Sequence, residues 1–278
     1  MPQRRSLESA LQAPRGTELP RFSANLGLLW ADRPLLQRIE AAAQAGFRAI
    51  EMHCPYEVPA AEVAAAVQRN GLRLLGINTV LGDVARGERG LGALPGRERD
   101  FQAAVDQAID YCVASGASAI HAMAGNVAAD DRPRARAVFA RNLRLAAEKA
   151  AAHDLPLLLE ALNPRDNPGY FYSTVAAAVS LIEELALPNI KLQFDVYHVA
   201  CSEGDVLKKL ERYMSVIGNV QIAAVPSRAE PDEGEIAYPA IFTALDALGY
   251  QGWVGCEYRP RGAMEAGLRW TQSLGVTL

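Results

Sequence analysis

Apolar positions along the chain fall into two kinds of segment that alternate from Arg21 onward. Short apolar runs with strand-like composition are each followed by a longer segment whose apolar residues recur every three or four positions, the period of an amphipathic helix. In the first of these longer segments, Leu35, Leu36, Ile39 and Ala43 fall on one face. The expected strands cover residues 22–29, 48–52, 72–78, 117–123, 155–160, 190–195, 219–223 and 253–257. The expected helices cover residues 34–44, 59–71, 97–115, 132–152, 174–186, 205–217, 238–248 and 263–274.

This alternation gives eight strand–helix pairs with no break in composition. Eight such units joined by right-handed crossovers form a closed (β/α)8 barrel, so we expect an α/β protein with one TIM-barrel domain over residues 21–278. Residues 1–20 are expected to be a flexible leader, because no apolar signal-peptide core follows Arg4 and Arg5. An open doubly wound sheet would normally carry a glycine-rich nucleotide loop. The nearest sequence here, Gly90-Leu-Gly-Ala-Leu-Pro95, lacks the last glycine of that motif.

The composition limits which cellular compartment and which binding partners are expected. With 278 residues, 50% of them hydrophobic, the chain is long enough for one barrel and its core. The net charge of −4 provides no basic surface, so no nucleic-acid partner is expected. No apolar run reaches the roughly 18 residues of a membrane span, so no membrane partner is expected either. The cysteines form no CxxC pair, which is typical of free thiols in a reducing cytoplasm: Cys54, Cys112, Cys201 and Cys256. We expect a cytoplasmic protein and leave homo-oligomer formation open, since exposed helix faces of such barrels often pair.

Four consecutive strands carry a polar residue at or near their carboxyl ends: Glu160, Asp195, Gln221 and Glu257. The carboxyl ends of all barrel strands meet on one face, with neighbours about 5 Å apart, so four such side chains can surround one ion. A single acid at a strand end is often only a surface cap, but four polar residues in consecutive units favour a metal site. Oxygen ligands suit Mg²⁺ or Mn²⁺ rather than zinc, which prefers His and Cys.

Further polar residues are expected near the same face and are candidates for binding a substrate. His198 lies three residues beyond Asp195, and Arg228, in the loop after the seventh strand, could clamp a carboxylate or hydroxyl group. His121 in the fourth strand and Asn78 at the end of the third strand complete the expected substrate-binding set. Ordinary packing for the histidines and solvation for the arginine remain the alternatives.

A cation held by carboxylates acts as a Lewis acid on a carbonyl group and its neighbouring hydroxyl group. The proton on the adjacent carbon then becomes acidic enough for a carboxylate to remove it. Glu160 and Glu257, facing each other across the substrate, could relay that proton between two carbons through an enediol. The expected chemistry is isomerisation or epimerisation without an organic cofactor.

Several motifs resemble one known family over nearly the whole chain, from about Arg21 to about Trp270. The chain resembles the hydroxypyruvate isomerases, a group of xylose-isomerase-like TIM barrels. The matching segments are Arg21-Phe-Ser-Ala-Asn-Leu26, Gly87-Glu-Arg-Gly-Leu-Gly-Ala-Leu-Pro-Gly-Arg-Glu98, Val220-Gln-Ile-Ala223, Glu230-Pro-Asp-Glu-Gly-Glu-Ile236 and Gly252-Trp-Val-Gly-Cys-Glu-Tyr-Arg-Pro260. The resemblance implies a metal-dependent aldose–ketose isomerase acting on a small hydroxy-oxo acid.

Within this group the chain looks nearer to the 2-dehydrotetronate (2-oxo-tetronate) isomerases. The segments that indicate this branch are Val138-Phe139, His121-Ala-Met-Ala-Gly125, Leu159-Glu-Ala-Leu162 and Tyr258-Arg-Pro-Arg-Gly262. Classical hydroxypyruvate isomerases tend to have Glu-Pro at Glu160-Ala161 and an Asp-Asn-Pro-His-Arg loop where this chain reads Ala224-Val-Pro-Ser-Arg228. That loop lies beside the substrate, so hydroxypyruvate itself is the less favoured substrate.

The resemblance also implies roles for individual residues. Glu160 and Glu257 would be the acid/base pair, and both would join Asp195 and Gln221 in binding Mg²⁺ or Mn²⁺. His198 and Arg228 would line the substrate pocket.

Three other functions remain open at this stage. A sugar 3-epimerase on the same barrel usually has a histidine where this chain has Gln221, which favours the isomerase. A zinc-dependent endonuclease of abasic DNA would need more than the four histidines present and a basic groove. A non-enzymatic binding protein would be favoured if the altered loop at residues 224–227 had destroyed the pocket.

The glycine-rich segment at residues 82–96 is too long for a simple connection. Loops of this length often cover active sites, so we expect a lid over the substrate.

Overall fold

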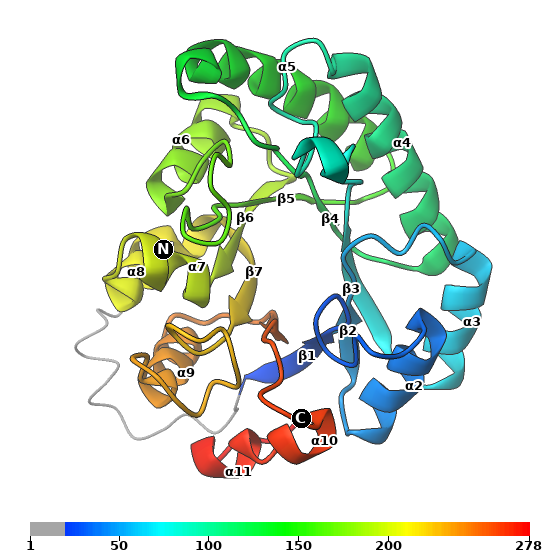
Figure 1. The fold of residues 1–278 in the computed structure, drawn as a ribbon, viewed down its shortest axis with the longest axis vertical. Helices are drawn as coiled ribbons and strands as arrows, with labels where there is room; N and C mark the ends of the chain where they lie inside the picture. Colours follow the sequence, from blue (N-terminus) through cyan, green and yellow to red (C-terminus); the bar gives the residue numbers. More distant parts are fainter. Residues whose placement is uncertain (1–19) are drawn as a thin grey trace.

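The computed structural model describes residues 20–278, so the predicted leader at residues 1–20 lies almost entirely outside the described residues. Eight parallel strands close into a barrel in sequence order, and the helices surround it (Figure 1). The strands are β1 Arg21–Asn25, β2 Ala49–Glu51, β3 Arg73–Asn78, β4 Ile120–His121, β5 Leu157–Glu160, β6 Ile190–Asp195, β7 Ile217–Ile222 and β8 Trp253–Cys256. The predicted fold class, a single (β/α)8 TIM barrel, is confirmed.

The helices that follow the strands form the outer layer (Figure 1). They are α2 Leu35–Gln44, α3 Ala60–Arg69, α4 Glu98–Ser115, α5 Arg132–Ala151, α6 Val175–Leu185, α7 Val196–Ser202, α8 Val206–Tyr213, α9 Tyr238–Ala247, α10 Met264–Gly267 and α11 Trp270–Leu274. The described residues also contain three short 3-10 helices, which are η1 Val84–Arg86, η2 Ala129–Asp131 and η3 Met214–Val216. None of the described helices has both the length and the apolar character needed to cross a membrane.

Several element boundaries differ from the sequence prediction. β1 ends at Asn25 instead of continuing to residue 29, because the Asn25 side chain accepts a hydrogen bond from the backbone of Gly27 at 2.9 Å and turns the chain. The helix predicted for residues 205–217 ends earlier, since Ile217 already begins β7. The last predicted helix is divided into α10 and α11.

The sequence prediction missed α7, which begins directly after β6. Asp195 caps this helix, because one of its carboxylate oxygens accepts the backbone N–H of Tyr197 at 2.8 Å. The β-branched and aromatic residues of α7 gave no helical signal. The Asp195 carboxylate therefore lies at both the end of β6 and the start of α7. The hydrogen bond that caps the helix fixes the direction of this side chain.

Apolar side chains pack between the barrel and its helices. Phe22 of β1, for example, contacts the rings of Phe242 in α9 and Trp270 in α11 edge to face, each at 5.4 Å between centroids. The interior of the barrel is different, because buried polar side chains line it toward the carboxyl ends of the strands: Asn25, Glu51, His121, Glu160, Gln193 and Gln221. Such side chains need hydrogen-bond partners or a ligand.

The segment at residues 82–96 is attached beside the end of β4. Gly90 pairs with Ala124 in an antiparallel bridge, and the backbone N–H of Gly92 donates to Met123 at 3.1 Å. Arg97 forms an ion pair with Glu88 across the base of the segment. Its proposed movement as a lid stays a prediction.

Candidate active site

The four predicted metal ligands lie at the carboxyl ends of neighbouring strands. Glu160 ends β5, Asp195 ends β6, Gln221 is the penultimate residue of β7 and Glu257 follows β8. Asp195 pairs in register with Gln221, so these two side chains stand at the same height. All four are buried, with at most 6% of the residue surface exposed.

Three of these side chains share a pattern: the protein fixes one terminal atom, and the other, an oxygen, has no hydrogen-bond partner in residues 20–278. Glu160 Oε2 accepts a hydrogen bond from Gln193 Nε2 at 2.8 Å, and Asp195 Oδ1 caps α7. Gln221 Nε2 donates to Glu51 Oε2 at 2.8 Å. The remaining oxygens, Glu160 Oε1, Asp195 Oδ2 and Gln221 Oε1, are buried and have no hydrogen-bond partner among the described residues.

These unpartnered oxygens fit a divalent cation. Burying an acceptor without a partner is costly, and three such atoms at adjacent strand ends would be satisfied together by one ion. Two of the residues, Glu160 and Asp195, offer oxygens that lie within 4.8 Å of one another and of a ring nitrogen of His198. The donors are oxygens of carboxylates and an amide, the chemistry that Mg²⁺ and Mn²⁺ prefer.

Glu257 differs from the other three because protein donors contact both of its oxygens. Oε1 accepts from Arg228 Nη2 at 2.9 Å, and Oε2 accepts from Asn25 Nδ2 at 3.2 Å. His53 Nε2 lies 3.4 Å from Oε1. A carboxylate surrounded by cationic and amide donors is held in its ionised form.

Electrostatics divide the carboxylates into two classes. Burial, followed by repulsion from Glu257 and Asp195, raises the pKa of Glu160 well above its ordinary value. Burial also raises the pKa of Asp195, to about 7. Burial acts against ionisation of Glu257 as well, but the contact with His53 and the charge of Arg228 outweigh it and lower its pKa to about 2. Glu160 and Glu257 therefore have opposite tendencies to hold a proton, as acid/base partners require.

His198 lies in α7, and its orientation is set by the loop after β5. The backbone N–H of Asn163 donates to His198 Nδ1 at 3.0 Å. Because Nδ1 is the acceptor, the ring proton of the neutral imidazole sits on Nε2, which faces Asp195 Oδ2 at 3.6 Å. Burial, and then the charge of Arg228, lower the pKa of His198 to about 3, so the ring is neutral. A protonated Nε2 is a hydrogen-bond donor, so we interpret His198 as a substrate contact and not as a metal ligand.

Arg228 is held by backbone hydrogen bonds on both sides. Its N–H donates to Ala224 at 2.8 Å, and its carbonyl accepts from Arg259 at 2.7 Å. These bonds keep Arg228 at a φ of +57°, which is unfavourable for a residue with a side chain and is often found at functional sites. The guanidinium group stacks over the Tyr197 ring, and its Nε is buried without a hydrogen-bond partner among the described residues.

His121 and Asn78 line the cavity inside the barrel, as do Glu160, Gln221 and Glu257. His121 Nδ1 lies 3.4 Å from Glu160 Oε2, and neither ring nitrogen of His121 has a hydrogen-bond partner within the described part of the chain. Burial lowers the pKa of His121 to about 4, so it is a neutral group facing the cavity.

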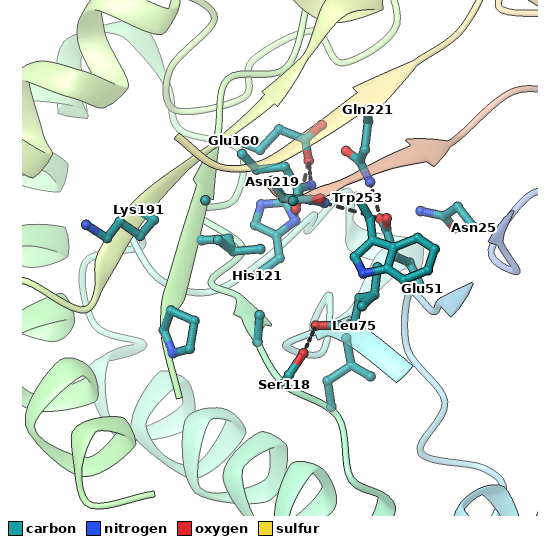
Figure 2. Close-up of a pocket in the computed structure, with 18 of the residues that line it drawn as sticks. Asn25, Glu51, Leu75, Ser118, His121, Glu160, Lys191, Asn219, Gln221 and Trp253 are labelled. Atoms are coloured by element: carbon teal, nitrogen blue, oxygen red, sulfur yellow. Dashed lines mark hydrogen bonds and ion pairs between the residues drawn. The ribbon is translucent and has the colours of Figure 1, made fainter. Parts of the chain in front are cut away.

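The cavity has a volume of about 340 Å³ and extends from the carboxyl ends of the strands into the barrel interior. Figure 2 shows Glu51, Gln221, Glu160 and His121 around it, with Trp253 further along its wall. This volume suits a small molecule.

Sequence reasoning missed Glu51, Asn25 and Asn163, which contact the predicted residues. Glu51 could have been found, because Ala49-Ile50-Glu51 is another apolar run that ends on an acid. The sequence prediction extended this strand to residue 52, which placed the acid inside the strand. Asn163 acts through its backbone N–H, and no sequence pattern reports such a contact.

Comparison with known proteins agrees with this architecture. The family model described as "Xylose isomerase-like TIM barrel" matches residues 39–274. The chain belongs to the xylose isomerase-like TIM-barrel family. Within this family it is 48% identical over 253 residues to a protein of Cupriavidus necator named 2-oxo-tetronate isomerase, covering 91% of this chain and 97% of that relative. It is 39% identical over 251 residues to the hydroxypyruvate isomerase of Escherichia coli, covering 90% and 97%. The resemblance drawn from the sequence is confirmed, and the chain is an enzyme of the isomerase class.

Two solved structures illustrate the shared fold. A Brucella melitensis protein described as an AP endonuclease of family 2 superimposes with a TM-score of 0.89 at 42% identity, covering 91% of this chain and 98% of that one. The 3-keto-D-glucoside 4-epimerase of E. coli superimposes with a TM-score of 0.77 at 22% identity, covering 92% and 100%, which shows a common fold alone.

Proposed function

We propose that this family member is a divalent-metal-dependent aldose–ketose isomerase of small hydroxy-oxo acids, with 2-oxo-tetronate favoured over hydroxypyruvate. The main support is the set of buried, unpartnered oxygens on Glu160, Asp195 and Gln221 beside a carboxylate, Glu257, that is kept ionised. The relatives named 2-oxo-tetronate isomerase and hydroxypyruvate isomerase support the substrate class.

Both substrates contain the same reacting unit, a carbonyl carbon C2 next to a hydroxyl-bearing carbon C3. Isomerisation moves one proton from C3 to C2 and another from the C3 hydroxyl oxygen to the C2 oxygen. The carbon skeleton is unchanged, so no external oxidant or reductant is needed. A Mg²⁺ or Mn²⁺ ion held by Glu160, Asp195, Gln221 and Glu257 would supply Lewis-acid polarisation of the two oxygens.

Glu257 is suited to remove the proton from carbon, because Arg228 and His53 keep its carboxylate ionised at neutral pH. Glu160 is suited to carry the proton to the neighbouring carbon, because burial gives its carboxyl group a higher affinity for a proton than that of Glu257. In the reverse direction the two residues exchange roles, as microscopic reversibility requires.

His198 and Arg228 would orient the substrate. His198 presents an N–H toward Asp195, in the space where a substrate oxygen would be bound. Arg228 presents its unpartnered Nε, which can donate to a hydroxyl or carboxylate oxygen. His121 and Asn78 would contact the part of the substrate that enters the barrel cavity.

The experiment is solvent deuterium exchange into hydroxypyruvate and 2-oxo-tetronate, followed by NMR with the purified protein and Mg²⁺, before and after EDTA. Metal-dependent uptake of label at the carbon next to the carbonyl is expected, faster for 2-oxo-tetronate. The Glu257→Gln protein is the control for non-enzymatic exchange. Absence of exchange with either acid, in protein shown to bind metal, would contradict the proposal. Exchange with free ketoses instead would favour a sugar 3-epimerase.

A further inference from the structure

Glu51 is a buried carboxylate inside the barrel that the proposed proton transfer does not use. It ends β2 and is 5% exposed. Its Oε2 accepts from Gln221 Nε2 at 2.8 Å and from Asn219 Nδ2 at 3.4 Å, while its Oε1 accepts from Ser23 Oγ at 2.7 Å. Figure 2 shows the contact between Glu51 and Gln221 across the cavity wall.

Gln221 is the one proposed ligand whose two terminal atoms differ. A carboxylate presents an oxygen whichever way it turns, but an amide turned by half a rotation would direct two N–H hydrogens at the cation. The orientation of Gln221 therefore decides whether it is a ligand or a repulsive group. Among the described residues, Glu51 is the group that contacts its amide nitrogen.

Glu51 Oε2 can accept the Gln221 hydrogen bond whether or not the Glu51 carboxyl group is protonated. Ser23 Oγ can accept as well as donate, so a proton on Oε1 would be shared with Ser23. Oε2 would still face the amide nitrogens of Gln221 and Asn219 as an acceptor. Gln221 Oε1 is then directed away from Glu51 and is left buried, with no hydrogen-bond partner in the described part of the chain.

The neighbouring strand makes room for this arrangement. Gly255 of β8 pairs in register with Gln221, and a Cβ atom at Gly255 would lie 2.4 Å from Glu51 Oε1 and 2.9 Å from Gln221 Cγ. Both distances are shorter than real contacts allow, so either side chain would have to shift. A glycine at this position permits the carboxylate and the amide to meet.

We propose that Glu51 is a positioning residue that selects the metal-binding orientation of the Gln221 amide, with Gly255 providing the space for it. The inference rests on the proposed metal site, and it goes further in assigning a function to a residue outside the ligand set. Partners that orient metal ligands in this way typically contribute about 10- to 100-fold to metal affinity.

The test measures Mn²⁺ affinity of the full chain by titration calorimetry and by electron paramagnetic resonance of free Mn²⁺. Glu51→Met keeps the length of the side chain but removes the acceptor, and it should weaken Mn²⁺ binding by about 10- to 100-fold. Glu51→Gln removes the charge but keeps an acceptor oxygen, so it should stay within a few-fold of wild type. This pair separates orientation of the amide from simple electrostatic attraction, which would weaken binding in both variants.

A double-mutant cycle with Gln221→Ala tests whether Glu51 acts through the amide. In the Gln221→Ala protein, adding Glu51→Met should cause no further loss of Mn²⁺ affinity. An equal loss in both backgrounds would overturn the proposal. If Glu51→Met does not fold, Gly255→Ala can be used instead, because its added Cβ displaces the Glu51 carboxylate. Unchanged Mn²⁺ affinity in Gly255→Ala would overturn the proposed role of Glu51. A wild-type protein that binds no Mn²⁺ would contradict the metal site itself, whereas wild-type binding with unaffected variants would contradict only the role of Glu51.

Discussion

Arg228 Nη2 donates to Glu257 Oε1 at 2.9 Å, and the same nitrogen lies 3.9 Å from Asp195 Oδ2. Only 12% of the Arg228 side chain is exposed, so its charge acts on both carboxylates with little screening by water. Burial opposes the charge of Arg228, but Glu257, Asp195 and Glu160 together raise its pKa above the ordinary value, so it remains a cation. One guanidinium group thereby connects the proposed base to a proposed metal ligand.

Glu257→Gln should keep the fold and most of the metal affinity but lower kcat by about 10³-fold, the effect of removing a general base. The amide oxygen of the variant can still accept from Arg228, so the loop containing Arg228 should stay in place. Steady-state kinetics and circular dichroism measure the two properties, and Glu62→Gln on the exposed face of α3 is the matched control. Near-normal turnover in Glu257→Gln would exclude the transfer of a proton between two glutamates.

His198→Asn should leave Mn²⁺ affinity within a few-fold of wild type while raising KM or lowering kcat by about 10²-fold. The reason is that Asn163 occupies Nδ1 and leaves a protonated Nε2, which can contact substrate but cannot bind a cation. Calorimetric titration with Mn²⁺ and steady-state kinetics separate the two effects. A loss of metal affinity as large as that of Asp195→Asn would instead make His198 a ligand.

The sequence was sufficient for the barrel because strand and helix periods alternate without interruption, and the strand-end positions of Glu160, Asp195 and Gln221 followed directly from it. It was insufficient where a role depends on contacts between distant segments. Glu51 is 170 residues from Gln221 in the chain, and their hydrogen bond exists only because the barrel closes. The tautomer of His198 likewise depends on a backbone group, which carries no sequence signal.

The metal affinity should depend on pH, because burial raises the pKa of Glu160 and raises that of Asp195 to about 7. A cation must displace these protons, so Mn²⁺ binding should weaken by up to about tenfold per pH unit, for each proton displaced, as the pH falls below about 7. Calorimetry in two buffers with different heats of ionisation should show proton release on binding. Identical heats in both buffers would contradict this linkage.

The same shifts predict how metal removal affects stability. An acid whose pKa is higher in the folded than in the unfolded chain contributes stability below the unfolded value, and this is lost as the pH rises through the folded value. For Asp195 the interval runs from 3.8 to about 7. The protein in EDTA should therefore lose this contribution as the pH rises through that interval, and saturating Mn²⁺ should raise the Tm most at or above neutral pH. Thermal unfolding followed by circular dichroism measures the Tm with and without Mn²⁺. An equal rise in Tm at all pH values would contradict the prediction.

His53 should control the acid limb of the pH–rate profile, because its contact with Glu257 helps to lower the pKa of that carboxyl group. With Mn²⁺ kept saturating at every pH, His53→Leu should raise the pKa of Glu257 and move the acid limb of kcat/KM to higher pH, with little change at neutral pH. Gly27→Ala should shift the limb in the same direction, since its Cβ would lie 2.2 Å from His53 Nδ1 and displace the ring. A purely structural role for His53 would lower activity equally at every pH. An unchanged acid limb in both variants would show that Arg228 alone keeps Glu257 ionised.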